Sequence, residues 1–360
     1  METKMAKGTA FDRIPLVDIS ALLGDDLEAK KAVAREMEKA ASEVGFLYVT
    51  GHGIAPEMIE KLQAKAAAFF ALPDEVKKKY YIGNSRAHRG YVPTGEENFY
   101  SGDVPTVDKK EAYDLSIDLA EDDPDHIRGY RLLGPNQWPT EIEGFKEDVY
   151  GYYEAATSLG RALFRGFALA LGLDEHYFDG YLTRPPSQLR LVHYPENETF
   201  DPTAIGGSDS NFGISPHTDY ECFTILHVTA PGLEVVNADG QWIDAPPVPG
   251  AFVINIGDML EAMTNGRFIA TAHRVRKINY ERYSFPLFCA VDYDTVVEPL
   301  PQFVEPGAAR IYPSYVAGDH LLAQTMRTFA YLRKLEKAGI LAIPESETTG
   351  EAFFGRKERA

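Results

Sequence analysis

The first half of the chain predicts strands and helices in alternation. Two apolar runs, IPLVDIS (residues 14–20) and GFLYVTGHGI (45–54), flank a charged stretch with helical periodicity at 27–44, and a second helix is expected through Phe70. In residues 140–173 large apolar side chains recur every four positions, which predicts a long helix, or a pair of helices, with one buried face. That apolar stripe consists of Leu159, Leu163, Phe167 and Leu171.

From residue 188 the pattern changes to short apolar segments separated by glycine and proline turns, with a hairpin turn at Asp239 and Gly240. Many short strands in succession favour a mainly β core, either a sandwich or a jelly-roll barrel, with helices flanking it. The expected strands lie in LRLVHYP, ECFTILHVTA, LEVVNADGQWIDA, AFVINIG, AHRVRKI and RYSFPLFCAVDYD. Residues 321–340 are again helical in pattern, and the tail after Pro344 is expected to be loosely ordered.

These patterns predict three segments without an internal repeat or a low-complexity linker. An N-terminal α/β segment (1–185) packs on a barrel, the barrel itself occupies 186–300, and a helical segment with a tail covers 301–360. We expect one barrel with the N-terminal helices packed against it, because no composition shift marks a separable domain.

Composition narrows the class of protein. The 360 residues are 44% hydrophobic and carry a net charge of −18, which opposes binding to nucleic acids and to anionic membrane surfaces. The start of the chain lacks the apolar stretch of a secretory signal or an anchor, and two cysteines, Cys222 and Cys289, cannot form a disulfide framework. We therefore expect a cytoplasmic protein, and nothing in its composition calls for an obligate protein partner.

The stretch SPHTDYECFTIL places His217 and Asp219 two residues apart beside an apolar run. On a strand, residues two apart point to the same side of the sheet, so both side chains would face the barrel interior. A second histidine, His273, follows after enough chain to return alongside on a distant strand. Two imidazoles and one carboxylate on one face of an iron leave its opposite face open, so these three residues are the candidate metal ligands.

Arg282 and Ser284 repeat the spacing of two downstream of His273, and Glu281 would point the opposite way. A guanidinium and a hydroxyl on an interior face can receive a carboxylate, because the guanidinium fork binds both carboxylate oxygens. An interior arginine otherwise needs an acidic partner, and none is close in sequence.

With His217-x-Asp219, His273 and Arg282-x-Ser284 in this order, the chain resembles the iron(II)/2-oxoglutarate dioxygenase superfamily, and within it the isopenicillin N synthase-like branch. IPLVDIS, GFLYVTGHGI and LVHYP are similar to segments of that branch, so the resemblance spans nearly the whole chain. It implies a double-stranded β-helix, a distorted jelly roll, as the fold.

The resemblance implies that His217, Asp219 and His273 bind Fe(II), and that Arg282 and Ser284 bind the distal carboxylate of the cosubstrate 2-oxoglutarate. It also implies use of O2, with release of succinate and CO2 and oxidation, by default hydroxylation, of a C–H bond in a small-molecule substrate. Tyr194 matches a position that often adds a phenol hydrogen bond, although a half-buried aromatic residue before a proline turn explains it equally. Some plant relatives have Asn two residues before this tyrosine, where this chain has Val192.

The sequence does not identify the substrate, but it nominates residues that share a face with the ligands or lie in loops above them. Arg190 could meet an anionic substrate or pair with an acidic loop at the rim, and Phe288 could line the cavity or pack in the core. The candidates are Arg89, Tyr91, Arg190, Thr224 and Phe288.

Three other functions share part of this pattern. Isopenicillin N synthase and aminocyclopropane carboxylate oxidase have Arg-x-Ser and iron but do not use 2-oxoglutarate. A non-catalytic ligand-binding barrel would not need both the metal ligands and the carboxylate receptor. A zinc hydrolase would need a general base beside the triad, and the sequence offers no obvious one.

Overall fold

The computed structural model describes residues 8–97, 110–196, 212–304 and 311–344. Within these ranges the core consists of two β-sheets. The larger has the strand order β1-β2-β10-β7-β12-β5-β4-β3, and the smaller has the order β6-β11-β8-β9. The strands of the two sheets are β1 (Leu16–Asp18), β2 (Phe46–Thr50), β3 (Gly90–Val92), β4 (Glu111–Leu115), β5 (Gln188–Tyr194), β6 (Phe212–His217), β7 (Phe223–Val228), β8 (Leu233–Val236), β9 (Trp242–Asp244), β10 (Phe252–Ile256), β11 (His273–Arg276) and β12 (Arg282–Cys289).

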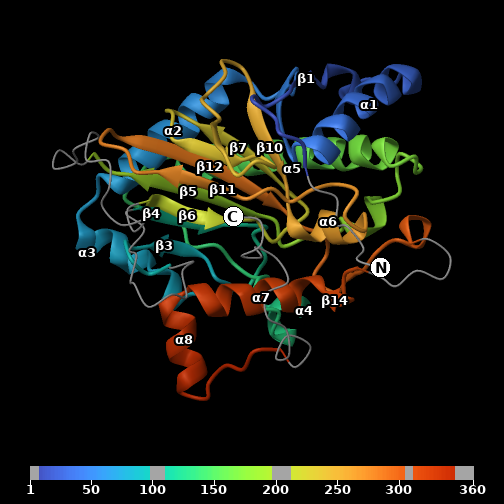
Figure 1. Cartoon of the computed structure of the whole chain (residues 1–360). Helices are drawn as coiled ribbons and strands as arrows, with labels where there is room; N and C mark the ends of the chain where they lie inside the picture. The colour runs from blue at the N-terminus through green and yellow to red at the C-terminus, as the bar shows by residue number, and fades with distance from the viewer. Residues whose placement is uncertain (1–7, 98–109, 197–211, 305–310, 345–360) are drawn as a thin grey trace.

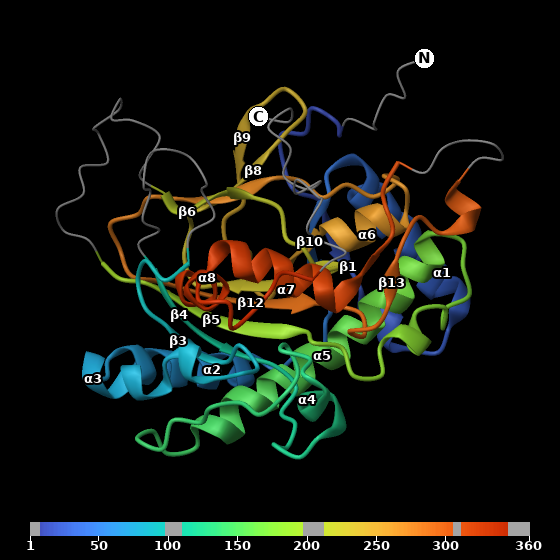
Figure 2. The same ribbon diagram turned by 90° about the horizontal axis from the view of Figure 1, so that it is seen from below.

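Helices cover one face of the larger sheet, and the smaller sheet lies over its other face (Figures 1 and 2). The helices are α1 (Leu27–Glu43), α2 (Pro56–Phe70), α3 (Asp74–Lys77), α4 (Pro124–Arg128), α5 (Phe145–Ala170), α6 (Asp258–Met263), α7 (Ala317–Thr328) and α8 (Ala330–Lys337). A small antiparallel pair, β13 (Val296–Val297) with β14 (Tyr315–Val316), precedes α7. No helix of the described residues is long and apolar enough to cross a membrane.

The central strands are buried on both sides, which explains their continuous apolar pattern. β10 and β12 are each lined by buried residues, apart from the half-buried Phe288 in β12, because helices cover one face and the pocket wall occupies the other. The predicted stripe on α5 is buried as expected, since Leu159, Leu163 and Phe167 pack in the main core. Gly160 of α5 allows close approach, because a Cβ there would lie 3.1 Å from the sulfur of Cys289.

The architecture is the predicted jelly roll, mainly β with flanking α, and its two sheets stay separate in the described residues. β1 and β2 from the N-terminal part extend the larger sheet at one edge, and β3 and β4 extend it at the other. The division at residues 185 and 300 stays a prediction.

Three local expectations differ from the structure, and a fourth falls on residues that the structure does not describe. β4 and β6 were not among the predicted strands, and the loop expected at residues 88–100 contains β3 in its described part. The C-terminal helix is broken at Phe329, whose extended backbone separates α7 from α8. The tail after Pro344 lies outside the described residues.

Candidate active site

The three candidate metal ligands meet between the two sheets. His217 is the last residue of β6 and His273 the first residue of β11, and the two are register partners in the smaller sheet. Asp219 does not share a strand with His217, contrary to the sequence expectation, because the chain leaves β6 after His217 and crosses to β7 in the larger sheet. The crossing segment, and not strand alternation, brings the carboxylate back to the histidines.

The geometry of the triad suits one metal ion. The Asp219 Oδ1 atom lies 3.6 Å from Nε2 of His217 and 3.6 Å from Nε2 of His273, and one ligand atom of each residue lies within 4.8 Å of the others. Each Nδ1 faces a backbone carbonyl, that of Ser215 at 2.8 Å and that of Thr271 at 3.3 Å. These contacts assign the proton to Nδ1 and leave both Nε2 lone pairs directed at the same point as Oδ1.

The second oxygen of Asp219 is already engaged. Oδ2 accepts hydrogen bonds from the Thr224 hydroxyl and from the Asn255 amide, the latter at 2.7 Å. Burial raises the pKa of Asp219, but the two histidines and these hydrogen bonds outweigh burial and bring the pKa below its ordinary value. Burial and the neighbouring His273 lower the pKa of His217 to about 4. At neutral pH the triad therefore offers an anionic oxygen and a neutral imidazole, the states that a metal ligand requires.

Gly257 shapes the segment that carries Asp219. A Cβ at this position would lie 2.2 Å from the carbonyl oxygen of Glu221 and 3.1 Å from that of Asp219. The backbone N–H of Gly257 donates to the Cys222 carbonyl at 2.9 Å, and that of Asp258 donates to the Asp219 carbonyl at 2.8 Å. Only a residue without a side chain allows this approach, so Gly257 helps to fix the carboxylate.

Arg282 is fully buried in the same pocket, and its guanidinium is only partly satisfied. Nε donates to the Ala230 carbonyl at 3.1 Å, whereas in the part of the chain that the structure describes Nη1 and Nη2 have no hydrogen-bond partner. Burial lowers the pKa of Arg282, with Tyr194 opposing the shift, and the guanidinium carbon lies 4.7 Å from the centre of the Tyr194 ring. Two buried donors on a residue that lines a pocket suit an anionic ligand.

The register of the larger sheet explains why the predicted carboxylate receptor is contiguous. Arg282 pairs with Tyr194, and Ser284 pairs with Val192, so the four side chains form two adjacent rows that line the pocket. Glu281 points to the other face, as expected, where it contacts His193 at 3.2 Å.

The pocket also contains three of the five candidate substrate residues. Phe288 and Thr224 are register partners on its floor, and the Thr224 hydroxyl is bound to Asp219. Arg190 lines the pocket but is not at an exposed rim, because it is buried and paired with two carboxylates. It binds both oxygens of Asp114 at 2.7 and 2.8 Å, and its Nη1 lies 2.9 Å from both oxygens of Glu97.

The other two candidates do not reach the pocket. Arg89 is buried and donates to the carbonyls of Ala87, His88 and Leu132, so its charge organises a turn. Tyr91 is buried against Phe69 of α2, and its hydroxyl donates to Glu111 at 2.6 Å. Tyr91 belongs to the edge strand β3 and Arg89 lies just before it, and neither side chain lines the pocket.

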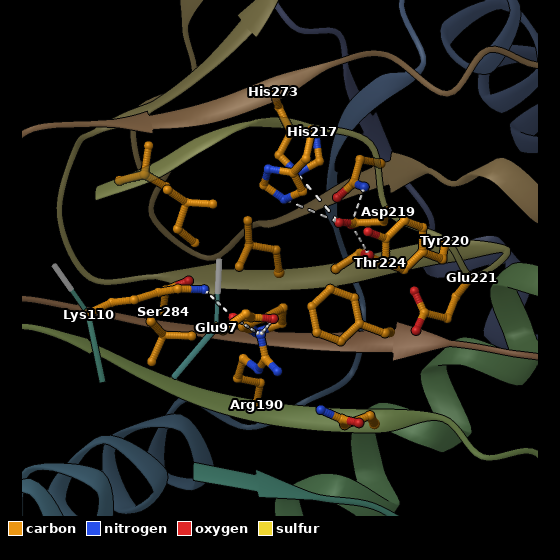
Figure 3. A pocket seen from close by; sticks show the side chains of 18 of the residues that line it. Glu97, Lys110, Arg190, His217, Asp219, Tyr220, Glu221, Thr224, His273 and Ser284 are labelled. Carbon is orange, nitrogen blue, oxygen red and sulfur yellow. Dashed lines mark hydrogen bonds and ion pairs between the residues drawn. The ribbon is translucent and has the colours of Figure 1, made fainter. Parts of the chain in front are cut away.

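Several pocket residues were not predicted from the sequence. The sequence could have indicated two of them. Glu221 repeats the spacing of two from Asp219, and Asn255 is a polar residue within an apolar strand. Figure 3 shows Glu221 entering the pocket from the side opposite Lys110 and Ser284. Thr325, Thr328 and Phe329 come from α7 and the break after it, and nothing in their sequence indicated a pocket.

Comparisons with known proteins agree with this geometry. Residues 185–291 match the model of the 2OG-Fe(II) oxygenase superfamily, and residues 14–141 match the non-haem dioxygenase in morphine synthesis N-terminal model. The chain belongs to the 2OG-Fe(II) oxygenase superfamily. It is an iron- and 2-oxoglutarate-dependent oxygenase, as its sequence predicts.

Two relatives illustrate the similarity. Homoarginine-6-hydroxylase 2-ODD-C23.1 of Arabidopsis thaliana is 34% identical, over 89% of this chain and 99% of that protein. The crystal structure of a full-length Neurospora crassa protein in complex with alpha-KG (2-oxoglutarate) and thymine superposes with a TM-score of 0.74 at 28% identity, covering 93% of this chain and 100% of that one. The chain described here therefore has the same fold, over nearly its whole length, as a protein crystallised with 2-oxoglutarate.

Proposed function

We propose that this oxygenase binds iron through His217, Asp219 and His273, and the distal carboxylate of 2-oxoglutarate through Arg282 and Ser284, with Tyr194 beside them. The observation that carries the assignment is the pair of buried Arg282 nitrogens, which have no hydrogen-bond partner among the described residues and lie in the same pocket as the triad. Two imidazoles and one carboxylate fit Fe(II), and a guanidinium with two available donors fits a carboxylate.

Each residue then has a defined task. The backbone carbonyls behind His217 and His273 hold their Nε2 atoms toward the metal, and Thr224 with Asn255 keeps Oδ2 of Asp219 engaged so that Oδ1 can bind. When bound, Fe(II) would activate O2, which is the oxidant both for a substrate C–H bond and for the conversion of 2-oxoglutarate to succinate and CO2. Arg282 orients the cosubstrate, and the apolar floor formed by Leu226, Pro286 and Phe288 limits water at the reacting atoms.

We further infer that the substrate is a small polar molecule. The pocket lies between the sheets beneath α7 and has polar and charged residues on its walls. Homologues named for homoarginine and a neighbour crystallised with thymine support a small molecule of this kind.

The test measures 2-oxoglutarate-dependent succinate release with Fe(II) and O2 during turnover of candidate small molecules, beginning with L-homoarginine and thymine. Succinate formation that requires 2-oxoglutarate and is lost in Asp219→Ala supports the proposal. Oxygen consumption that proceeds without 2-oxoglutarate would instead support the oxidase alternative.

A further inference from the structure

Among the described residues, most charged side chains of the pocket form ion pairs with a side chain of opposite charge. Among the described residues, Arg190 is neutralised by Asp114 and Glu97, and the ammonium of Lys110 lies 2.6 Å from Glu97. Two positive and two negative groups cancel within this cluster, so it presents no net charge to a ligand.

With both cofactors bound, the charges of Arg282, Asp219, the iron ion and 2-oxoglutarate would balance one another. Arg282 receives one carboxylate of 2-oxoglutarate, and an iron dication is balanced by Asp219 together with the other carboxylate. Glu221 is then left as the single unmatched charge among the described pocket residues. Part of this reasoning rests on the proposed function, since it counts the charges of the bound cofactors.

The surroundings of Glu221 contain no cation that pairs with it. In the described part of the chain no lysine, arginine or histidine forms an ion pair with its carboxylate, and Arg190, which acts on it from farther away, is bound to other acids. The half-buried Glu221 carboxylate therefore has no positive partner among the described residues.

Glu221 also lies where a substrate has room. β12 runs from Arg282 to Cys289, and the residue after Glu221 donates its backbone N–H to the Cys289 carbonyl at 2.9 Å. Glu221 and Arg282 are therefore at opposite ends of β12, with the triad close to the Glu221 end because Thr224 binds Asp219 there. Figure 3 shows Ser284 on the side of the pocket opposite Glu221, so a cosubstrate that reaches from the triad toward Ser284 leaves the Glu221 end open.

We propose that the substrate of this enzyme carries a cationic nitrogen group, an ammonium or a guanidinium, and that the Glu221 carboxylate binds it. The pairing places a positive charge against the negative charge that has no partner among the described pocket residues, and it orients the rest of the molecule toward the triad. Glu221 is thus a specificity-determining residue that selects organic cations over their neutral isosteres.

The experiment measures binding without turnover, on full-length protein loaded with Zn(II) in place of iron and with 2-oxoglutarate. Saturation-transfer NMR follows four cations, methylguanidinium, n-butylammonium, L-lysine and L-arginine, and their neutral partners methylurea, n-butanol, L-norleucine and L-citrulline. Wild-type protein, Glu221→Gln and Glu141→Gln are compared. Glu141→Gln removes the same charge from a surface site that pairs with Lys79, so it controls for the net charge of the protein.

We expect at least one cation to bind the wild type and Glu141→Gln alike, its neutral partner to bind at least 10-fold more weakly, and Glu221→Gln to lose at least 10-fold in affinity for the cation. The inference is overturned if no cation binds, if a neutral partner binds as well as its cation, or if Glu221→Gln binds the cations unchanged. Calorimetry of 2-oxoglutarate on the same samples separates the two proposals. Intact 2-oxoglutarate binding without cation binding overturns only this inference, whereas loss of 2-oxoglutarate binding in the wild type overturns the proposed function.

Discussion

The amide of Asn255 donates to Oδ2 of Asp219 at 2.7 Å, and together with the Thr224 hydroxyl it decides which oxygen of the carboxylate faces the two histidines. Asn255 lies on β10 and Asp219 on the segment between β6 and β7, so the contact joins the larger sheet to the segment that crosses between the sheets. The metal site is thereby tied to the core of the protein and not only to the smaller sheet.

Removing the hydrogen bonds behind Asp219 should weaken metal binding. Thr224→Val and Asn255→Ala each take one donor from Oδ2, and we expect each to lower Fe(II) affinity about 10- to 100-fold, as for other residues that orient metal ligands. Equilibrium dialysis with Fe(II) under nitrogen measures the effect. Thr157→Val is the control, because it removes a buried hydroxyl on α5 that has no hydrogen-bond partner in the described ranges; unchanged affinity in both site variants would refute the role of these donors.

Each ligand of the triad should be indispensable for turnover but not for folding. We expect His217→Ala, Asp219→Ala and His273→Ala to abolish 2-oxoglutarate-dependent succinate formation while circular dichroism shows an intact fold. His176→Ala, at a mostly exposed histidine paired with Asp179, should retain activity. Turnover retained in the alanine variants of the triad would contradict the metal assignment.

Gly257→Ala should disturb the site through packing alone. A Cβ placed 2.2 Å from the Glu221 carbonyl must push the Asp219 segment away, and overpacking of this kind costs about 1–3 kcal/mol. Urea unfolding measures the loss of stability, and Fe(II) titration measures the displacement of the carboxylate. Gly180→Ala, where a Cβ would meet nothing within 4 Å, is the matched control; equal behaviour of the two variants would disprove the close approach.

His88 should make stability depend on pH. It is buried, accepts or donates one hydrogen bond with Tyr331 at 2.7 Å, and burial followed by Arg190 and Arg89 lowers its pKa from 6.5 to about 3. Because the unfolded chain takes up this proton first, the stabilisation from neutral His88 is complete above about pH 6.5 and falls as the pH drops toward 3.

Urea unfolding at pH 7.5 and pH 5.0 tests this sign. His88→Asn keeps a residue that tolerates the positive φ of 59° but cannot titrate, so it should lose about 2 kcal/mol less than the wild type between the two pH values. Identical losses in both proteins would mean that His88 is protonated in the folded state.

The sequence predicts much of this site because its chemistry is concentrated in short motifs. Arg282 and Ser284 sit on one strand, so their spacing translates directly into a shared face. His217 and Asp219 reach the right place for a different reason, since Asp219 lies beyond the strand and depends on Gly257 and Asn255 for its position. Strand periodicity alone does not contain that information.

The residues that line the rest of the pocket depend on long-range packing. Phe329 lies at the break between α7 and α8 and forms an isolated antiparallel β-bridge with Glu97, more than two hundred residues earlier in the chain. This bridge holds Phe329 beside the site. Arg190 shows the same limit, because its pairing with Asp114 comes from the register of β4 with β5, and β4 has no clear strand pattern. Tyr91 was misplaced for a related reason, since a loop and an edge strand have similar composition there.

The measurement that tests the central claim most directly is an anaerobic titration of the Fe(II) protein with 2-oxoglutarate, followed through the weak visible charge-transfer band of the chelate. The wild type should develop the band, and Arg282→Ala should need about 10- to 100-fold more 2-oxoglutarate, because it loses charged hydrogen bonds worth about 1.5–3 kcal/mol. Arg274→Ala, which removes an arginine paired with Glu234, should titrate like the wild type. Iron binding without a band in the wild type, or an unchanged titration in Arg282→Ala, would contradict the account.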